Sequence, residues 1–315
     1  MDFPVVISGK NVDLFEFTEL SKDWSVDFIQ LGGGSFLSSI YQVLFPEFHL
    51  AYVHFNSSVK QEGRSPKGYW SFAFADDIEL FWRNKSVAPK SIIVYAPDSE
   101  INAVNNSDFD VMIFSIEESL LFQFAKQTNA DDLMEKLDSG LLSCSVDLWD
   151  TLRNTILSEI TEYNSNENHS NKFQFLDSFT LSLLELLKTS KPSIKKVSNV
   201  TRLQLLTDVE HYIQDNISEK ITIPELAKCC NVSERTLLYT FKKRFKIGPK
   251  AYIKVLKLNC VYRILHGDTQ GKTISNIARQ FGFWHMGQFH ADYKAFFGEL
   301  PSETVAKEKL RLLKS

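Results

Sequence analysis

The feature that most constrains the fold is a pattern of apolar residues that occurs twice in the last third of the chain. Segments 223–249 and 274–301 carry matching side chains, first at a spacing of 51 residues and then, after one inserted residue, at a spacing of 52. Duplication at this length predicts two copies of one supersecondary unit with the same structural task. The matched pairs are Ile223 and Ile274, Leu226 and Ile277, Ala227 and Ala278, Val232 and Phe283, Leu237 and Phe289, Phe241 and Tyr293, Phe245 and Phe297, and Pro249 and Pro301.

Each copy predicts a helix, a tight turn and a second helix. In the first copy, Ala227 permits close approach of the next helix, Asn231 suits the turn, and Ser233 is a candidate N-cap. In the second copy, Gly282 supplies the turn, because glycine adopts positive φ at little cost. We expect the second helices at 233–245 and 284–297, with their large apolar residues packed inward.

The segment between the copies predicts a rigid spacer. Residues 250–265 read as one helix, about 24 Å long at 1.5 Å per residue. Such a spacer can hold the two second helices so that they enter successive major-groove segments of one duplex, about 34 Å apart.

The N-terminal part is expected to contain mainly strands. Region 24–116 is rich in β-branched and aromatic residues, and turn signals such as the three glycines at 32–34 divide it into short runs. Many short strands at this spacing favour a sandwich or a barrel.

Helices are expected after these strands, at 117–127, 146–162 and 173–188. The apolar stripe of the last helix fits either a dimer seam or packing on its own domain. A polar segment at 190–199 then predicts an interdomain linker.

Charge is distributed unevenly along the chain. Residues 199–315 contain 19 Lys and Arg against 11 Asp and Glu, a net of +8, whereas residues 1–198 contain 16 against 28, a net of −12. This asymmetry indicates that only the C-terminal part meets a polyanion, although chance drift between domains is an equal alternative on charge alone.

We expect a cytoplasmic protein without a membrane partner. The four cysteines, at positions 144, 229, 230 and 260, form no Cys-x-x-Cys motif and predict buried thiols in a reducing cytosol. The longest apolar stretch, 40–55, is interrupted by polar residues and a proline, so it does not predict a membrane span. The first residues lack the pattern of a secretory signal.

The two repeats and their spacer together match a known pattern. Its anchors are 224–227, 233–245, Gly248-Pro249, Ile277-Ala278, Gly282-Phe283 and 289–301. With these anchors, about 203–312 resembles the AraC/XylS family of bacterial transcription regulators. Segment 282–302 looks most like the ethanolamine-operon regulator subgroup of that family. One departure is Lys246, where the first unit of the family usually has glycine.

The resemblance implies an α+β chain of two domains. We expect a cupin-like β-barrel with trailing helices at 1–189, which senses an effector or dimerises, the linker at 190–199, and an all-α double helix-turn-helix domain at 200–315. Metal-binding cupins carry His-x-His with a Glu and another His, but here His49 and His54 are five residues apart. We therefore expect no metal and no cofactor.

The aromatic residues of the N-terminal part fit two interpretations. They line an apolar ligand pocket, or they fill the interior of the barrel, and filling is favoured residue by residue. These residues are Tyr41, Phe45, Phe48, Tyr52, Phe55, Trp70, Phe72, Phe74 and Trp82.

The resemblance also implies that the second helix of each unit contacts DNA. Base-facing positions fall on Arg235, Leu238 and Tyr239 in the first helix and on Met286, Gly287 and Ala291 in the second. His285, Gln288 and His290 lie nearby. The complete candidate set is Ser233, Arg235, Leu238, Tyr239, Lys242, Lys243, His285, Met286, Gln288, His290, Ala291 and Lys294.

Side-chain chemistry refines these roles. Arg235 can read guanine with two hydrogen bonds, Gln288 can read adenine, and Leu238 and Met286 can touch a thymine methyl group. The second helix has little polar reach elsewhere, so it reads shape or contacts the DNA backbone. The lysines are expected to contact phosphate. Each candidate also has a structural alternative as a surface, packing or capping residue.

These observations favour a sequence-specific transcription regulator, an activator and not an enzyme. Its expected partners are double-stranded DNA, RNA polymerase, an unidentified small-molecule effector and a second copy of the chain. Two alternatives stay open: a cupin-type enzyme with an appended helical domain, and an architectural DNA binder without sequence preference.

Overall fold

The computed structural model describes residues 4–21, 24–75, 79–83, 85–130, 132–165, 171–193, 200–267, 269 and 271–313. The chain divides into two compact units. Unit 1 contains Met1–Phe28, Leu37–Asn56 and Gln61–Val197, and unit 2 contains Ile29–Phe36, Ser57–Lys60 and Ser198–Ser315. Most of the expected linker, 194–199, lies outside the described residues, and the expected domain boundaries stay a prediction.

The strands form two antiparallel sheets. The larger sheet has the order β1 (Val5–Val12), β3 (Ser38–Leu44), β4 (Phe48–Phe55), β11 (Phe109–Glu117), β6 (Tyr69–Ala75), β9 (Ser91–Tyr95), β12 (Leu141–Ser143) and β13 (Lys191–Pro192). The smaller sheet has the order β2 (Ser25–Gln30), β5 (Val59–Arg64), β10 (Glu100–Asn105), β7 (Leu80–Trp82) and β8 (Lys85–Ser86). Over the described residues both sheets are open, so the expected closed cupin-like barrel is not confirmed. The alternating apolar pattern correctly predicted strands.

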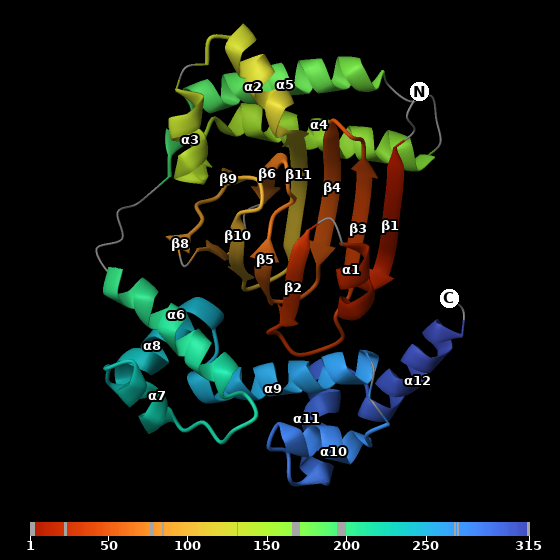
Figure 1. Cartoon of the computed structure of the whole chain (residues 1–315), viewed down its shortest axis with the longest axis vertical. Coiled ribbons are helices and arrows are strands. Elements are labelled where there is room, and N and C mark those ends of the chain that lie inside the picture. The colour runs from red at the N-terminus through yellow and green to blue at the C-terminus, as the bar shows by residue number, and fades with distance from the viewer. Residues whose placement is uncertain are drawn as a thin grey trace. The chain divides into compact units, whose positions relative to one another are not determined.

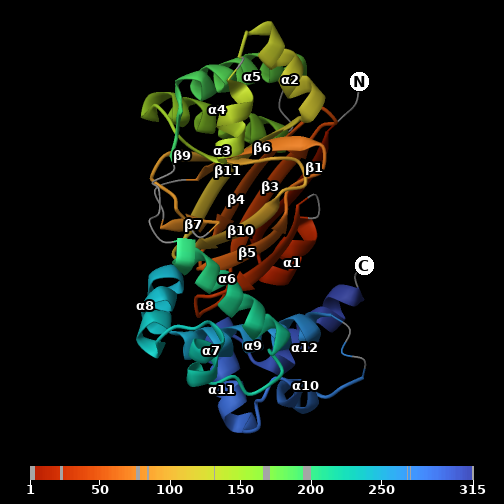
Figure 2. The same cartoon turned by 60° about the vertical axis from the view of Figure 1, so that its left-hand side comes forward.

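Helices cover one face of the larger sheet (Figures 1 and 2). They are α2 (Glu118–Gln127), α3 (Leu133–Ser139), α4 (Val146–Ser165) and α5 (Lys172–Thr189), while α1 (Leu14–Leu20) lies beside β1 and β3. In α5, the apolar stripe packs on its own unit: the rings of Phe179 and Phe114 lie 4.5 Å apart, and Leu183 is fully buried. Burying each such side chain stabilises the fold by about 1.5–3 kcal/mol. Packing on its own domain is therefore the correct alternative for this stripe.

Alternation along the strands gives the larger sheet two different faces. Phe72 and Phe114 point into the core beneath the helices, whereas Ala73 and Ile113, one residue along each strand, line the side that the smaller sheet covers. Most of the aromatic residues considered as pocket-lining lie on the helix side or at its margin. Among them only Phe55 lines the space between the sheets.

Unit 2 is helical apart from its two short N-terminal segments. Its helices are α6 (Val200–Asp215), α7 (Ile223–Cys229), α8 (Glu234–Phe245), α9 (Pro249–His266), α10 (Ile274–Gln280), α11 (Met286–Phe297) and α12 (Pro301–Leu312). The expected order of helices is confirmed. Over the part of the chain that is described, no helix is both long enough and apolar enough to cross a membrane.

Candidate nucleic-acid interface

The first helix-turn-helix unit consists of α7 and α8. A reciprocal capping box starts α7: the amide of Glu225 donates to the hydroxyl of Thr222 (3.4 Å), and the amide of Thr222 donates to the Glu225 carboxylate (3.0 Å). Hydrogen bonding of the Glu225 carboxylate to the Thr222 side chain, and then to the Thr222 backbone amide, holds the pKa of Glu225 below its ordinary value. After α7 the chain turns at Asn231, whose φ of 52° is left-handed, and the Val232 amide donates to the Ala227 carbonyl (2.9 Å).

The second unit, α10 and α11, repeats this geometry. Thr273 caps α10 by accepting from the amide of Asn276 (3.2 Å). The turn is made at Gly282, with φ of 81°, and the Phe283 amide donates to the Ala278 carbonyl (3.1 Å). This bond is the counterpart, 51 residues later, of the one in the first unit. The predicted roles of Asn231 and Gly282 in the turns are therefore confirmed.

Helix α9 holds the second helix of each unit. Near its start, the Tyr252 ring lies 4.3 Å from the ring of Phe245 on α8, and near its end the Tyr262 ring lies 4.5 Å from Phe297 on α11. The two tyrosines are ten residues apart, about 15 Å along the helix axis. A single rigid element thus contacts the buried anchors of both helices, as the spacer interpretation requires. It is slightly longer than expected, 18 residues.

The inward-facing residues of α8 and α11 are those that the sequence predicts. Leu237, Phe241 and Phe245 are buried on α8, and Phe289, Tyr293 and Phe297 are buried on α11. Because these anchors occupy one side of each helix, the other side is left to solvent.

Nearly all candidate DNA-binding residues lie on the exposed sides of these helices or at their first turn. On α8, the side chains of Leu238 and Tyr239 are 42% and 55% exposed although they are large and mainly apolar. Only Met286 is partly buried. The exposed candidates are Ser233, Arg235, Leu238, Tyr239, Lys242, Lys243, His285, Gln288, His290, Ala291 and Lys294.

Two of these candidates already have structural roles in the free protein. The hydroxyl of Ser233 accepts the Thr236 amide (3.1 Å), so Ser233 is the N-cap of α8. The side-chain amide of Gln288 donates to Asp292 one turn later (2.9 Å), and Asp292 also pairs with Lys254 (2.7 Å). Gln288 must leave this partner before it reads a base.

The start of α11 differs from the expectation. The helix begins at Met286, not at Trp284, and His285 occupies the N-cap position without a side-chain hydrogen bond. Trp284 therefore precedes the helix and is 69% exposed. Trp284 is not among the candidate DNA-binding residues expected from the sequence, where it was placed as the first residue of this helix. Its position before the first turn of α11 was the signal that could have identified it.

The ends of α8 and α11 show how the chain tolerates Lys246. Lys246 has φ of 60° and Gly298 has φ of 79°, and each terminates its helix at corresponding positions of the two units. The helix end expected at Lys246 therefore forms without glycine. A non-glycine residue in this conformation stores about 1 kcal/mol of strain.

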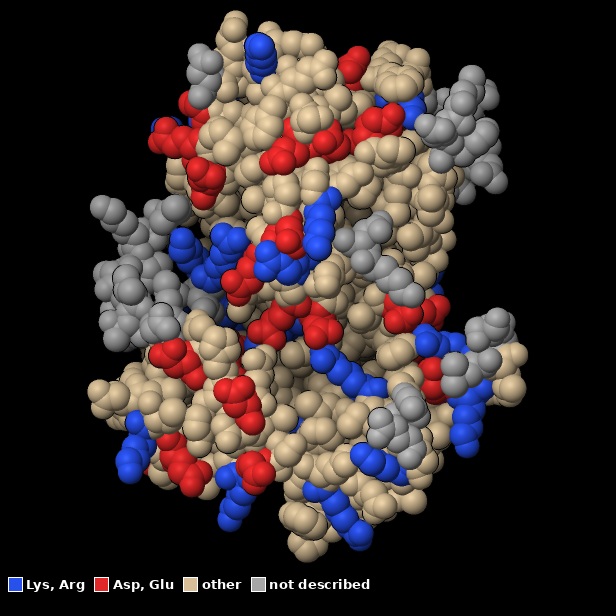
Figure 3. Space-filling view, in the orientation of Figure 1, with Lys and Arg blue, Asp and Glu red and all other residues tan. Residues whose placement is uncertain are grey.

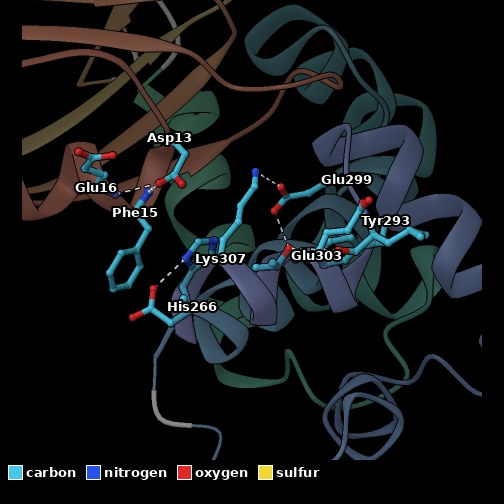
Figure 4. Close-up of polar contacts among 11 residues, drawn as sticks. Asp13, Phe15, Glu16, His266, Tyr293, Glu299, Glu303 and Lys307 are labelled. Atoms are coloured by element: carbon cyan, nitrogen blue, oxygen red, sulfur yellow. Dashed lines mark hydrogen bonds and ion pairs between the residues drawn. The ribbon is translucent and has the colours of Figure 1, made fainter. Parts of the chain in front are cut away.

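Polar contacts fix α11 against α12 (Figure 4). The Tyr293 hydroxyl lies 2.9 Å from the hydroxyl of Thr304, which donates to Glu299 (2.6 Å), and Glu299 pairs in turn with Lys307. Burial raises the pKa of Tyr293 above its ordinary value, so the hydroxyl keeps its proton at neutral pH. This network limits rotation of α11 about its own axis.

Charges on the visible face of unit 2 are unevenly spread. In Figure 3, acidic and basic side chains are both present over α6–α8, whereas basic ones predominate over α10–α12. Lys272 and Arg279, near and on α10, are exposed. They add to the lysines of α8 and α11 as groups that can neutralise phosphate.

Comparisons with known proteins bear on the same helices. A helix-turn-helix domain model matches residues 226–307. The chain is 31% identical over 132 residues to XylDLEGF operon transcriptional activator 2 of Pseudomonas putida, covering 42% of this chain and 84% of that protein. It is 34% identical over 106 residues to XylDLEGF operon transcriptional activator 3 of the same species. That match covers 33% of this chain but spans only 32% of the relative's length.

One solved structure is also similar in sequence to part of this chain. The crystal structure of a probable AraC family transcriptional regulator from Rhodopseudomonas palustris CGA009 is 30% identical, with a TM-score of 0.32. The match covers 33% of this chain and 97% of that one. The first activator is matched over most of its length and above 30% identity, and the matched helix-turn-helix domain model spans most of the two units. The chain therefore belongs to the AraC/XylS family of helix-turn-helix transcription regulators.

Proposed function

We propose that the protein recognises a specific DNA duplex with α8 and α11 and thereby activates transcription. The observation that carries this proposal is the equivalence of the two helices. Each follows a turn of the same geometry, each is anchored by three buried large residues, and each leaves its other side exposed. The names of the two Pseudomonas putida relatives support activation in preference to repression.

Individual roles follow from side-chain chemistry. The exposed guanidinium of Arg235, in the first turn of α8, suits a guanine edge, and Leu238 and Tyr239 suit thymine methyl groups and sugars. On α11, Gln288 reads adenine after it exchanges Asp292 for the base. Lys242, Lys243 and Lys294 bind phosphate, with His285, Met286, His290 and Ala291 beside the groove.

Unit 1 is proposed to sense a small molecule or to dimerise, and RNA polymerase is the proposed partner in activation. The likeness of 282–302 to the ethanolamine-operon subgroup stays a prediction, as does a cytoplasmic location. Among the described residues, no group of three or more His, Cys, Asp and Glu side chains is placed to hold a metal ion. This observation gives no support to a metal-dependent enzyme.

Selection of duplexes from a random library by the purified full-length chain tests the proposal. We expect enrichment of one bipartite sequence, bound at least about 1,000-fold more tightly than random DNA at physiological salt. Equal affinity for random and selected DNA would instead show an architectural binder, and absence of binding would overturn the proposal. A variant with Arg235→Ala and Gln288→Ala, both exposed positions, controls for enrichment that does not depend on the two helices.

A further inference from the structure

A cavity lies inside unit 1, between the larger sheet and the smaller one. Its empty space, including the solvent at its open mouth, is about 680 Å³. Residues from nine strands of the two sheets, together with α1 and the segment after it, contribute to its walls. The cavity is thus separate from the helix-packed core on the opposite face of the larger sheet.

Small side chains on the larger sheet create this space. Across its strands, Gln42 on β3 pairs with Ala51, Ala51 with Ile113, Ile113 with Ala73, and Ala73 with Ile93. All five residues line the cavity. Two alanines therefore alternate with longer side chains in one row, and their short side chains leave empty space in the cavity. A protein interior normally fills such gaps, because empty volume costs dispersion energy.

Two amide groups in the cavity wall have unmet hydrogen-bonding capacity. Gln42 is 4% exposed, and its Oε1 is a buried acceptor for which the described residues provide no donor. The Nε2 of Gln61 on β5 is a buried donor for which they provide no acceptor. Leaving a buried polar group unpaired costs about 1–3 kcal/mol, so both atoms favour a bound partner.

The described residues that line the cavity include no Lys, Arg, Asp, Glu or His. Its other walls are mainly aliphatic and aromatic, as at Phe55 and Tyr95. A charged ligand would lose its hydration there without gaining a counter-charge, which is costly. An uncharged ligand loses little and gains apolar contact.

We propose that this cavity binds an uncharged, mainly apolar small molecule whose hydroxyl or primary amide group donates to Gln42 and accepts from Gln61. The inference rests on the proposed role of unit 1 as a sensor and assigns the chemical class of the effector. The absence of charged lining residues and the two amide atoms each restrict that class independently.

Isothermal titration of the full-length chain with three matched probes tests the proposal: 2-naphthamide, 2-naphthoate and naphthalene. We expect 2-naphthamide to bind at least about tenfold more tightly than the other two. Naphthalene lacks the polar group, and 2-naphthoate brings a charge. Naphthoate binding as tightly as the amide, or no binding of any probe up to its solubility limit, would overturn the assignment.

Variants locate the site. Ala73→Phe fills this empty space and should abolish binding of 2-naphthamide, whereas Ala125→Leu, an equally buried alanine on the helix-covered side, should not. Gln42→Leu should weaken binding of the amide about five- to tenfold and leave binding of naphthalene unchanged.

The filled variant can fail to fold, which circular dichroism would show, and Gln42→Leu then decides the question alone. Equal binding by the wild type and Gln42→Leu would contradict the polar contact. These titrations contain no DNA, and duplex selection contains no probe. Failure of the ligand assignment is therefore distinguishable from failure of the proposed DNA recognition.

Discussion

At position 287 on α11, no contact and no backbone angle of the free protein requires a glycine. Gly287 is the second residue of the helix, and a Cβ added there would have no atom within 4 Å apart from its chain neighbours and the nearby backbone of its own helix. Its φ is also not among the positive values that favour glycine. Replacing a helical glycine of this kind with alanine stabilises by about 0.5–1 kcal/mol, because alanine has less conformational entropy to lose. For Gly287→Ala we therefore expect the Tm to rise by about 2–5 °C.

The same substitution should weaken binding to DNA. A glycine at the start of a recognition helix permits close approach of a phosphate backbone. An added methyl group there must push the helix away or displace the phosphate. We expect the affinity for the selected duplex to fall about tenfold, or roughly 1.4 kcal/mol, although the protein itself is more stable.

Thermal unfolding and fluorescence anisotropy with a labelled duplex measure the two effects. Ala306→Gly, at an exposed position on α12, is the matched control: it should lower the Tm and leave the affinity for DNA unchanged. If Gly287→Ala raises the Tm and leaves DNA binding at the wild-type level, DNA does not approach α11 at this residue, and the reasoning is refuted.

The structure also predicts how two substitutions change stability and in which order three cysteines react. Lys246→Gly should relieve the left-handed strain at the end of α8 and raise the free energy of unfolding by about 1 kcal/mol in chemical denaturation; a decrease would show that the lysine side chain stabilises the helix end. Thr222→Ala should remove the capping box of α7 and lower that free energy by about 1 kcal/mol, and no change in the denaturation midpoint would contradict this role. Burial raises the pKa of Cys144 and of Cys230 to about 11, which leaves little thiolate at pH 8. Iodoacetamide should therefore modify exposed Cys229 first, with reaction at the other two accelerating as the pH approaches 11; faster modification of Cys144 than of Cys229 at pH 8 would disprove this order.

The helix-turn-helix units were predictable from the sequence because their determinants are local. Ala227, Asn231 and Ser233 act on neighbours within a few residues, and the repetition of the pattern 51 and then 52 residues later checks each assignment twice. The start of α11 was placed two residues too early, since the apolar pattern continues through Trp284 while the helical backbone does not.

The architecture of unit 1 was less predictable, because it depends on contacts between distant segments. Short alternating strands are common to barrels and to paired open sheets, and closure is decided by edge strands that the pattern does not specify. The cavity depends on register: Ala51 and Ala73 become neighbours of Ile113 only after β4, β6 and β11 pair. The hydrogen bond from Gln288 to Asp292 could not be predicted from the sequence either, because each of these polar side chains can equally point into solvent without a protein partner.

The central claim is that α8 and α11 read two parts of one duplex, held at a fixed distance by α9. Duplex selection repeated with Arg235→Ala and, separately, with Gln288→Ala tests it most directly. We expect each variant to lose base preference at its own position, with a cost of about 1–3 kcal/mol at the preferred site for Arg235→Ala. The two affected positions should lie about one helical turn, 10–10.5 base pairs, apart. Base preferences that stay unchanged in both variants, or that change at the same or adjacent base pairs, would contradict the claim.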